Sequence, residues 1–343
     1  EEVELAEKLT EIHPWSDCVR FTRTGGESCA LAIRIARSFT SKNKVAFCGY
    51  HGWHDWYLAT NLAAGDQLKD QLLPGLAPSG VPTQLHDTAL PFREGDIDGF
   101  KHIISKHGAD LGVVMMEVFR HGMPDINFIQ QVSQLCEQHN IVLIFDEISS
   151  GFRLNAGGAH LLFGIEPDIC ILGKALGNGH PIGAVIGKRR IMDAAQKSFI
   201  SSSYWTERVG FVAALKTIQI FQQSDVCKVL NKTGSKLKYE MRKICEQVGF
   251  DIKFIGVDSV PILIFPTDDA LALKTLYTQE MLKKGILAAN VIYVSVAHTT
   301  EHCNVFLAAF EDVIKRLKRA LEEGTIIDRL DGPVCHSGFQ RLN

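Results

Sequence analysis

The sequence predicts an α/β protein: a large domain with a mixed, mostly parallel sheet and helices on both faces, followed by a smaller C-terminal α+β domain. Three short segments are almost continuously apolar, as expected for parallel strands covered on both faces: LGVVMMEV (111–118), IVLIFDEI (141–148) and DICILGK (168–174). An amphipathic segment, 125–140, lies between the first two and completes a strand–helix–strand unit. After residue 205 the pattern changes, which indicates a second domain.

The N-terminal part alternates helical and strand-like segments. Residues 2–12 repeat apolar side chains at helical spacing, and residues 27–39 do the same with Arg34 and Arg37 on the polar side. KVAFCGY (44–50) is typical of a strand. The chain begins without Met and inside the first helical pattern, so we expect an N-terminal segment of the natural protein to be missing.

The C-terminal part combines helices with short strands. Two helical patterns continue to residue 247, and the later segments are strand candidates at 250–257, 260–266 and 291–298 and helices at 268–284 and near 300–322. We place the boundary inside the long helical stretch, which gives a large domain of residues 1–225 and a small domain of residues 226–343.

Composition narrows the functional classes. The net charge of −3 gives no broad basic surface for nucleic acid or an anionic membrane. The sequence shows neither an apolar run of membrane-spanning length nor a signal peptide. Nine cysteines, without a C-x-x-C pair, indicate reduced thiols in a cytoplasmic protein rather than disulfides or a zinc site. Composition is thus compatible with a small-molecule enzyme and with a scaffold protein.

Ionisable residues end the three apolar strands. Glu117 ends the first, Asp146 and Glu147 the second, and Lys174 the third. Ligands of open α/β sheets bind at the carboxyl ends of the strands, so these charges lie where a site is expected.

Lys174 has two interpretations. A lysine at the end of a buried strand is often ion-paired or extends its charge to solvent. It is also the residue type that acts as a nucleophile and forms Schiff bases. Glycines follow it in GKALGNGHPIG, which would let a ligand approach the backbone, but the sequence is not a phosphate-binding P-loop.

Asp146 also has two interpretations. It could pair with an arginine such as Arg153, because a buried carboxylate is costly without a partner. It could instead hold a proton on a heterocyclic nitrogen and make an aromatic cofactor a better electron sink. Ile148, two residues later, could pack on the face of such a ring or belong to the core.

Two further segments could bind parts of the same ligand. TGGES (24–28) places two glycines at a helix start, where free N–H groups bind phosphate, although a simple capped turn has the same pattern. Tyr50 follows a strand and could stack on a planar ligand. His51 and His54 lack a third clustered ligand, so we expect no metal site.

Together these groups match the parts of pyridoxal phosphate. FDEISSGFR (145–153) and ILGKALGNGHPIGA (171–184) resemble the signature of the class III aminotransferases, which have fold type I. CGYHGWHDW and RTGGES are similar to that family's aromatic and phosphate segments. The resemblance extends from about residue 2 to the end of the chain and is closest to the subgroup of glutamate-1-semialdehyde aminomutase and its transaminase relatives.

The resemblance implies a role for each strand-end residue. Lys174 matches the lysine that forms the Schiff base with the cofactor and then serves as base and acid. Asp146 matches the aspartate on the pyridine nitrogen. Ile148 and Tyr50 match the residues on the two faces of the ring, and Glu117 matches a glutamate near the cofactor.

The phosphate site follows from the same resemblance. Gly25 and Gly26 match the phosphate-binding turn, and a hydroxyl residue of the partner subunit completes the site in a homodimer. Thr206 is our choice for that residue, with Ser203 as the rival. Gly26 stands where the family has threonine, so one side-chain contact to the phosphate is lost.

The implied activity is transfer of an amino group from a donor to an aldehyde or ketone acceptor. An aminomutase, which moves the amino group within one substrate, is the nearest alternative, although the family's EPV is EVF (117–119) here. A different class of alternative is an aminotransferase domain of a larger multifunctional protein, or a cofactor-binding module without catalysis.

Overall fold

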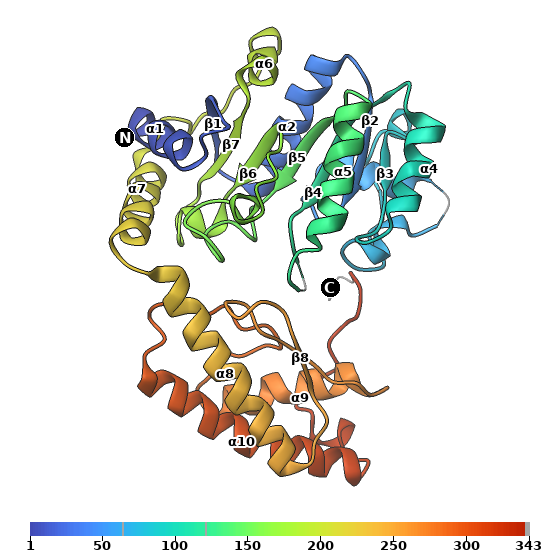
Figure 1. Cartoon of the computed structure of the whole chain (residues 1–343). Coiled ribbons are helices and arrows are strands. Elements are labelled where there is room, and N and C mark those ends of the chain that lie inside the picture. Colours follow the sequence, from blue (N-terminus) through green and yellow to red (C-terminus); the bar gives the residue numbers. More distant parts are fainter. Residues whose placement is uncertain (64, 121, 340–343) are drawn as a thin grey trace. The chain divides into compact units, whose positions relative to one another are not determined.

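The computed structural model describes residues 1–63, 65–120 and 122–339. They separate into two compact units. The first holds the described residues of Glu1–Arg120 and Pro124–Ser224, and the second holds those from Asp225 onward, with residues 122 and 123. Figure 1 traces both units along the chain. Within the described residues, no helix is both long and apolar enough to cross a membrane.

A seven-stranded sheet forms the centre of the first unit. Its strands lie in the order β1-β7-β6-β5-β4-β2-β3. The bounds are β1 (Cys18–Thr22), β2 (Lys44–Cys48), β3 (Ala89–Pro91), β4 (Leu111–Glu117), β5 (Val142–Asp146), β6 (Ile169–Leu172) and β7 (Gly183–Gly187). β7 runs antiparallel to both of its neighbours, β1 and β6, and the other neighbouring pairs are parallel, so the predicted mixed, mostly parallel sheet is confirmed.

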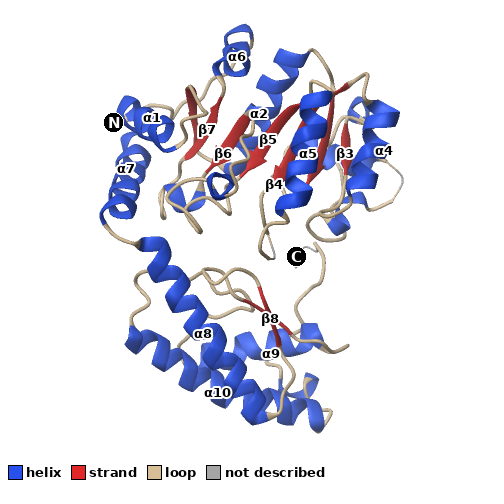
Figure 2. Ribbon diagram, in the orientation of Figure 1, coloured by secondary structure: helices blue, strands red, loops and turns tan. Residues whose placement is uncertain are grey.

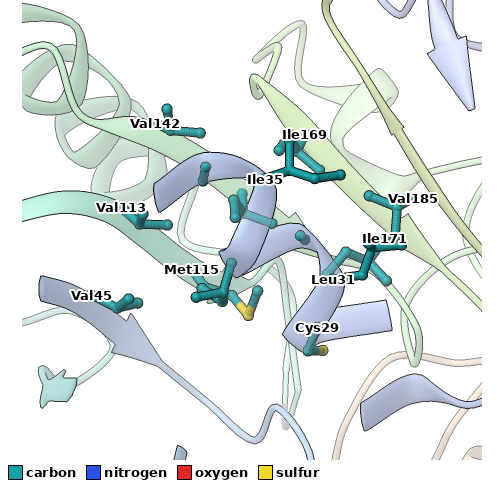
Figure 3. Packing of buried hydrophobic residues seen from close by; sticks show 14 of the residues in the cluster. Cys29, Leu31, Ile35, Val45, Val113, Met115, Val142, Ile169, Ile171 and Val185 are labelled. Atoms are coloured by element: carbon teal, nitrogen blue, oxygen red, sulfur yellow. The ribbon is translucent and has the colours of Figure 1, made fainter. Parts of the chain in front are cut away.

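Alternate residues of each strand face different helices. Ile169 and Ile171 of β6 pack in one cluster with α2 (Gly25–Thr40), and Figure 3 shows Leu31 and Ile35 of that helix among strand side chains. Cys170 and Leu172 pack in another cluster with side chains of α1 (Glu2–Ile12) and α7 (Arg208–Gln223). Burial on both faces explains why these strands have no polar alternation.

Most of the remaining helices of this unit lie between two strands in chain order (Figure 2). Longer ones are α4 (Ile97–His107) and α5 (Ile126–Gln138); short ones are α3 (Asp55–Leu58), α6 (Arg189–Met192) and 3₁₀ turns at Ala59–Leu62, Gln67–Asp70, Thr83–Leu85, Ala159–Leu162, Lys174–Leu176 and Asp193–Lys197. The sequence patterns do not predict β1, β3, β7 or α4. β7 reads GAVIG, and its two glycines obscure a strand pattern that pairing on both edges stabilises.

The second unit has its own apolar core. Its elements are α8 (Val226–Val248), β8 (Lys253–Ile255), β9 (Ile262–Ile264), α9 (Ala270–Lys283), α10 (Thr300–Glu322) and a 3₁₀ turn at Ile327–Arg329. Leu273 and Tyr277 of α9 pack with Phe310 and Val313 of α10, and all four are fully buried. Strands β8 and β9 form an antiparallel pair.

The strand candidate at 291–298 is wrong. The segment runs beside residues 259–263, with hydrogen bonds from Ile292 N to Pro261 O and from Val294 N to Ser259 O. It forms only an isolated bridge at Val291. Tyr293 and Val296 are more than half exposed, so its apolar side chains do not cover a second face.

Candidate active site

A cavity of about 490 Å³ lies at the carboxyl ends of β5 and β6, within the size range of small-molecule sites. It brings together residues that were predicted from four separate segments of the sequence. The predicted residues that line it are Gly25, Gly26, Tyr50, Asp146, Ile148 and Lys174. Other residues line it as well, for which no role at this site was predicted from the sequence: Arg23, Cys29, His51, Ser149 and His180.

Lys174 lies just beyond the end of β6. Gly173 separates it from the strand, and its φ of +43° is in the left-handed region, which is rare for a residue with a side chain. Such conformations are held by their surroundings and occur often at functional sites. The ammonium group donates a 2.5 Å hydrogen bond to Ser149 Oγ, which directs it along the cavity wall formed by residues 148 and 149.

Asp146 ends the adjacent strand and is almost completely buried. Its Oδ1 accepts a hydrogen bond from Ile148 N at 3.1 Å, and its Oδ2 accepts one from His51 Nδ1 at 2.7 Å. The Cys29 thiol lies 3.5 Å from the same Oδ2. Burial, reinforced by the Asp146 carboxylate, raises the pKa of that thiol, so Cys29 stays a neutral donor. The observed ionisable partner of Asp146 is thus His51.

No role beyond that of a rejected metal ligand was predicted for His51 from the sequence. The ring is buried, and its second nitrogen, Nε2, lies 3.2 Å from Cys48 O. Both ring nitrogens therefore face oxygen acceptors, which fixes the ring and directs Nδ1–H at Asp146. The available signal was its position next to Tyr50, at the same sheet edge as Asp146.

The start of α2 presents the backbone of Gly25 and Gly26 without side chains; we call this site the phosphate cradle. Thr24 caps the helix, and its hydroxyl accepts the N–H of Glu27 in a capping box. The N–H groups of Gly25 and Gly26 have no acceptor within the helix because they belong to its first turn. A Cβ on Gly25 would lie only 3.1 Å from Ile148 Cδ1. The glycines thus keep the helix terminus open beside Ile148, an arrangement that fits a phosphate.

Glu117 lies behind Tyr50 rather than on the cavity wall formed by the described residues. Its Oε2 accepts the backbone N–H of Tyr50 at 3.0 Å and pairs with Arg120 at 3.4 Å. Burial raises the pKa of Glu117 above its usual range. Gly49 precedes this turn with φ +115°, and a Cβ there would collide with the Glu117 carboxylate. In this structure Glu117 holds the turn that presents Tyr50.

Thr206 and Ser203 are not among the described residues that line this cavity. Thr206 lines a different hollow with Trp205 and residues of α1. Its assigned role requires a second subunit and stays a prediction.

Glu147, next to Asp146, is fully buried and points away from the cavity. Its Oε1 accepts hydrogen bonds from the backbone and ring of His160, at 3.0 and 2.5 Å. Its Oε2 accepts hydrogen bonds from Ala159 N and Ser150 Oγ, at 2.6 and 2.8 Å. The carboxylate therefore fixes the segment that follows β5, and we assign it a structural role.

We expect Glu147→Gln to lower the free energy of unfolding by about 1–3 kcal/mol, because an amide N–H₂ would face donors that now meet carboxylate oxygens. Denaturant unfolding measures the loss. Glu166→Gln, at an exposed position, should change stability by less than about 0.5 kcal/mol. Equal unfolding midpoints for the wild type and Glu147→Gln would contradict the structural role.

The wild type and Glu147→Gln also test how the stability contributed by Glu147 depends on pH. Burial alone raises the pKa of Glu147, but the hydrogen bonds from His160 and Ala159 outweigh it and hold the pKa below its ordinary value. The stability that such a carboxylate contributes is present above its unfolded pKa, about 4.3, and is lost as the pH falls through the folded pKa. The difference between wild type and Glu147→Gln should therefore shrink in acid.

Residues 1–314 match the family Aminotransferase class-III. The chain belongs to this family. The predicted class III aminotransferase is thereby confirmed. The chain is 31% identical over 329 residues to 3-aminobutyryl-CoA aminotransferase of Cloacimonas acidaminovorans (strain Evry), covering 92% of this chain and 75% of the relative.

The class III aminotransferase is also similar to an aminomutase and to a transaminase of known structure. Glutamate-1-semialdehyde 2,1-aminomutase of Hyperthermus butylicus is 30% identical over 340 residues, covering 92% of this chain and 79% of its own length. A solved structure described as a transaminase with PLP bound superposes with a TM-score of 0.81 at 26% identity, over 94% of this chain and 78% of that chain. The predicted family fold and its cofactor, pyridoxal phosphate, agree with these similarities.

Proposed function

We propose that this class III aminotransferase binds pyridoxal phosphate in the Lys174 cavity and transfers an amino group from a donor to an aldehyde or ketone acceptor. One observation carries the proposal: a lysine, a buried carboxylate and an open helix start meet in one cavity although they come from distant segments. These are the groups that the aldehyde, the ring nitrogen and the phosphate of this cofactor need: a nucleophile, a hydrogen-bond acceptor and backbone N–H donors.

Each residue of the cavity would have a role that follows from its position. Lys174 would bond covalently to the cofactor aldehyde and, when released, would move the proton taken from the substrate carbon. When bound, pyridoxal phosphate supplies a ring that accepts the electron pair left by that proton. Asp146, oriented by His51, would hold a proton on the ring nitrogen. Ile148 and Tyr50 would contact the two ring faces, and Gly25 and Gly26 would bind the phosphate.

Intramolecular amino transfer uses the same cavity, so the substrate has to be tested directly. The protein loaded with pyridoxal phosphate should lose its visible absorbance band on addition of a true donor and regain it with a true acceptor. Donors should include simple amino acids and 3-aminobutyryl-CoA, and glutamate 1-semialdehyde should be tested alone. Turnover of the semialdehyde without a second substrate would establish the aminomutase, and no response to any amine would contradict both.

We also propose a homodimer in the cytoplasm. The segment 199–206 supports the dimer, because Phe199 and Tyr204 are 88% and 68% exposed and the partner-facing hydroxyl is expected there. The nine free cysteines support a reducing compartment. Sedimentation equilibrium should give twice the mass of one chain, and a monomer that binds the cofactor at full affinity would contradict the shared site.

A further inference from the structure

The turn that follows β5 is held by the backbone on both sides of Ser149. Gly151 N donates to Glu147 O at 2.8 Å, which closes the turn. Glu147 N donates to Ile171 O of β6 at 2.9 Å, which joins the turn to the strand that leads to Lys174. The position of Ser149 relative to the lysine is therefore fixed by the sheet edge itself.

The hydroxyl of Ser149 is the partner of the Lys174 amine. Lys174 Nζ donates to Ser149 Oγ at 2.5 Å, and both residues line the cavity. Among the described residues, no carboxylate forms an ion pair with this nitrogen, and Ser149 Oγ is the side-chain atom to which it bonds. Lys174 is exposed and Ser149 is half-buried, so a ligand in the cavity can reach both. A hydroxyl group, and not a negative charge, thus determines where the amine lies.

We propose that Ser149 is a positioning residue that binds the Lys174 amine whenever the lysine is not bonded to the cofactor. The inference rests on the proposed function, because it concerns the release and return of this lysine. On release, the donor nitrogen forms a double bond to the aldehyde carbon while the double bond from that carbon to Nζ breaks. The proton that leaves the donor nitrogen goes to Nζ, which then has N–H groups to donate to Ser149 Oγ.

The Ser149 hydroxyl should favour the free lysine over the bonded one. A free amine has two N–H groups, or three when protonated, and can direct one of them to Oγ. A nitrogen in a double bond to carbon has at most one N–H group, and its direction is fixed by the plane of that bond. The contact with Ser149 is therefore weakened or lost when Lys174 bonds to the aldehyde. Removal of the hydroxyl should shift the balance toward the bonded lysine.

The proposal is tested by binding to the full chain, freed of cofactor. Pyridoxal phosphate has an aldehyde that bonds to Lys174, whereas pyridoxamine phosphate has an amine in that place and leaves the lysine free. We expect Ser149→Ala to bind pyridoxal phosphate about two- to tenfold more tightly, the range for one ordinary hydrogen bond, because the free lysine loses its partner. The dissociation constant of pyridoxamine phosphate should stay the same, since the lysine is free before and after binding.

Two variants and a labelling experiment serve as controls. Ser149→Thr keeps the hydroxyl and should keep both dissociation constants near the wild-type values. Ser105→Ala removes an exposed hydroxyl on α4 and should also change neither constant. In the cofactor-free chain, brief reaction with an amine-acylating reagent and peptide mapping should show faster labelling of Lys174 in Ser149→Ala than in the wild type or Ser149→Thr.

Three results would overturn the inference. Equal changes in the two dissociation constants would show that Ser149 supports the cavity wall or contacts the ligand. Weaker binding of pyridoxal phosphate alone would show that the hydroxyl stabilises the bonded lysine, and unchanged constants for both ligands would show that it does not hold the amine. Failure of the proposed function is a different result, in which borohydride traps no bond between Lys174 and pyridoxal phosphate in the wild type.

Discussion

Lys174→Ala should lower kcat by at least about 10²–10⁴-fold, the range that a positioned acid–base group contributes, and should abolish covalent capture of the cofactor. The lysine follows β6 with a left-handed backbone, and its amine lies in the cavity within 2.5 Å of Ser149 Oγ. An alanine there removes the amine and leaves the cavity walls in place. Borohydride reduction followed by peptide mapping measures the capture, and steady-state rates measure the loss.

Two control variants separate chemistry from charge. Lys174→Arg keeps a cation but cannot bond to an aldehyde, so it should be as inactive as the alanine variant. Lys188→Ala removes a lysine that pairs with Asp168 at 3.2 Å, outside the cavity lining, and should retain capture and turnover. Labelling of a different lysine in the wild type would refute the assignment.

Asp146→Asn should lower kcat by at least about a hundredfold while the cofactor remains bound, because an amide cannot hold the ring nitrogen protonated as a carboxylate does. Asp146 is almost fully buried, and its Oδ2 accepts a hydrogen bond from His51 Nδ1 at 2.7 Å. Loss of the Asp146 charge should therefore lower the reaction rate and leave phosphate binding at the start of α2 unchanged. Separate measurements of kcat and cofactor affinity distinguish the two effects.

A cofactor analogue gives the sharper test of Asp146. A pyridoxal phosphate methylated at the ring nitrogen carries a fixed positive charge and should restore part of the rate in Asp146→Ala, where space is available for the methyl group. Asp98→Asn, an exposed carboxylate on α4, is the matched control and should leave the rate unchanged. A kcat of Asp146→Asn within a few-fold of the wild-type value would contradict the role of Asp146 at the ring nitrogen.

The strands that carry the charged ends could be predicted because they are buried on both faces. LGVVMME, VLIFD and ICIL have no competing periodicity, and the observed strands differ from the predicted segments by a few residues at their ends. The segment 291–298 has similar composition but lies at an exposed edge. Apolar composition alone did not distinguish the two, since a strand depends on a partner for its backbone.

By itself the sequence determined the βα order, the family and the residues that end β5 and β6, because buried strands and short motifs are local patterns. Only the tertiary structure decided which groups meet those residues. His51 reaches Asp146 across 95 positions, Ser149 meets Lys174 across 25, and His54 fills the space beside Gly26. Such contacts form where separate turns meet at one sheet edge. A local sequence pattern does not predict which residues, far apart in the chain, come together there.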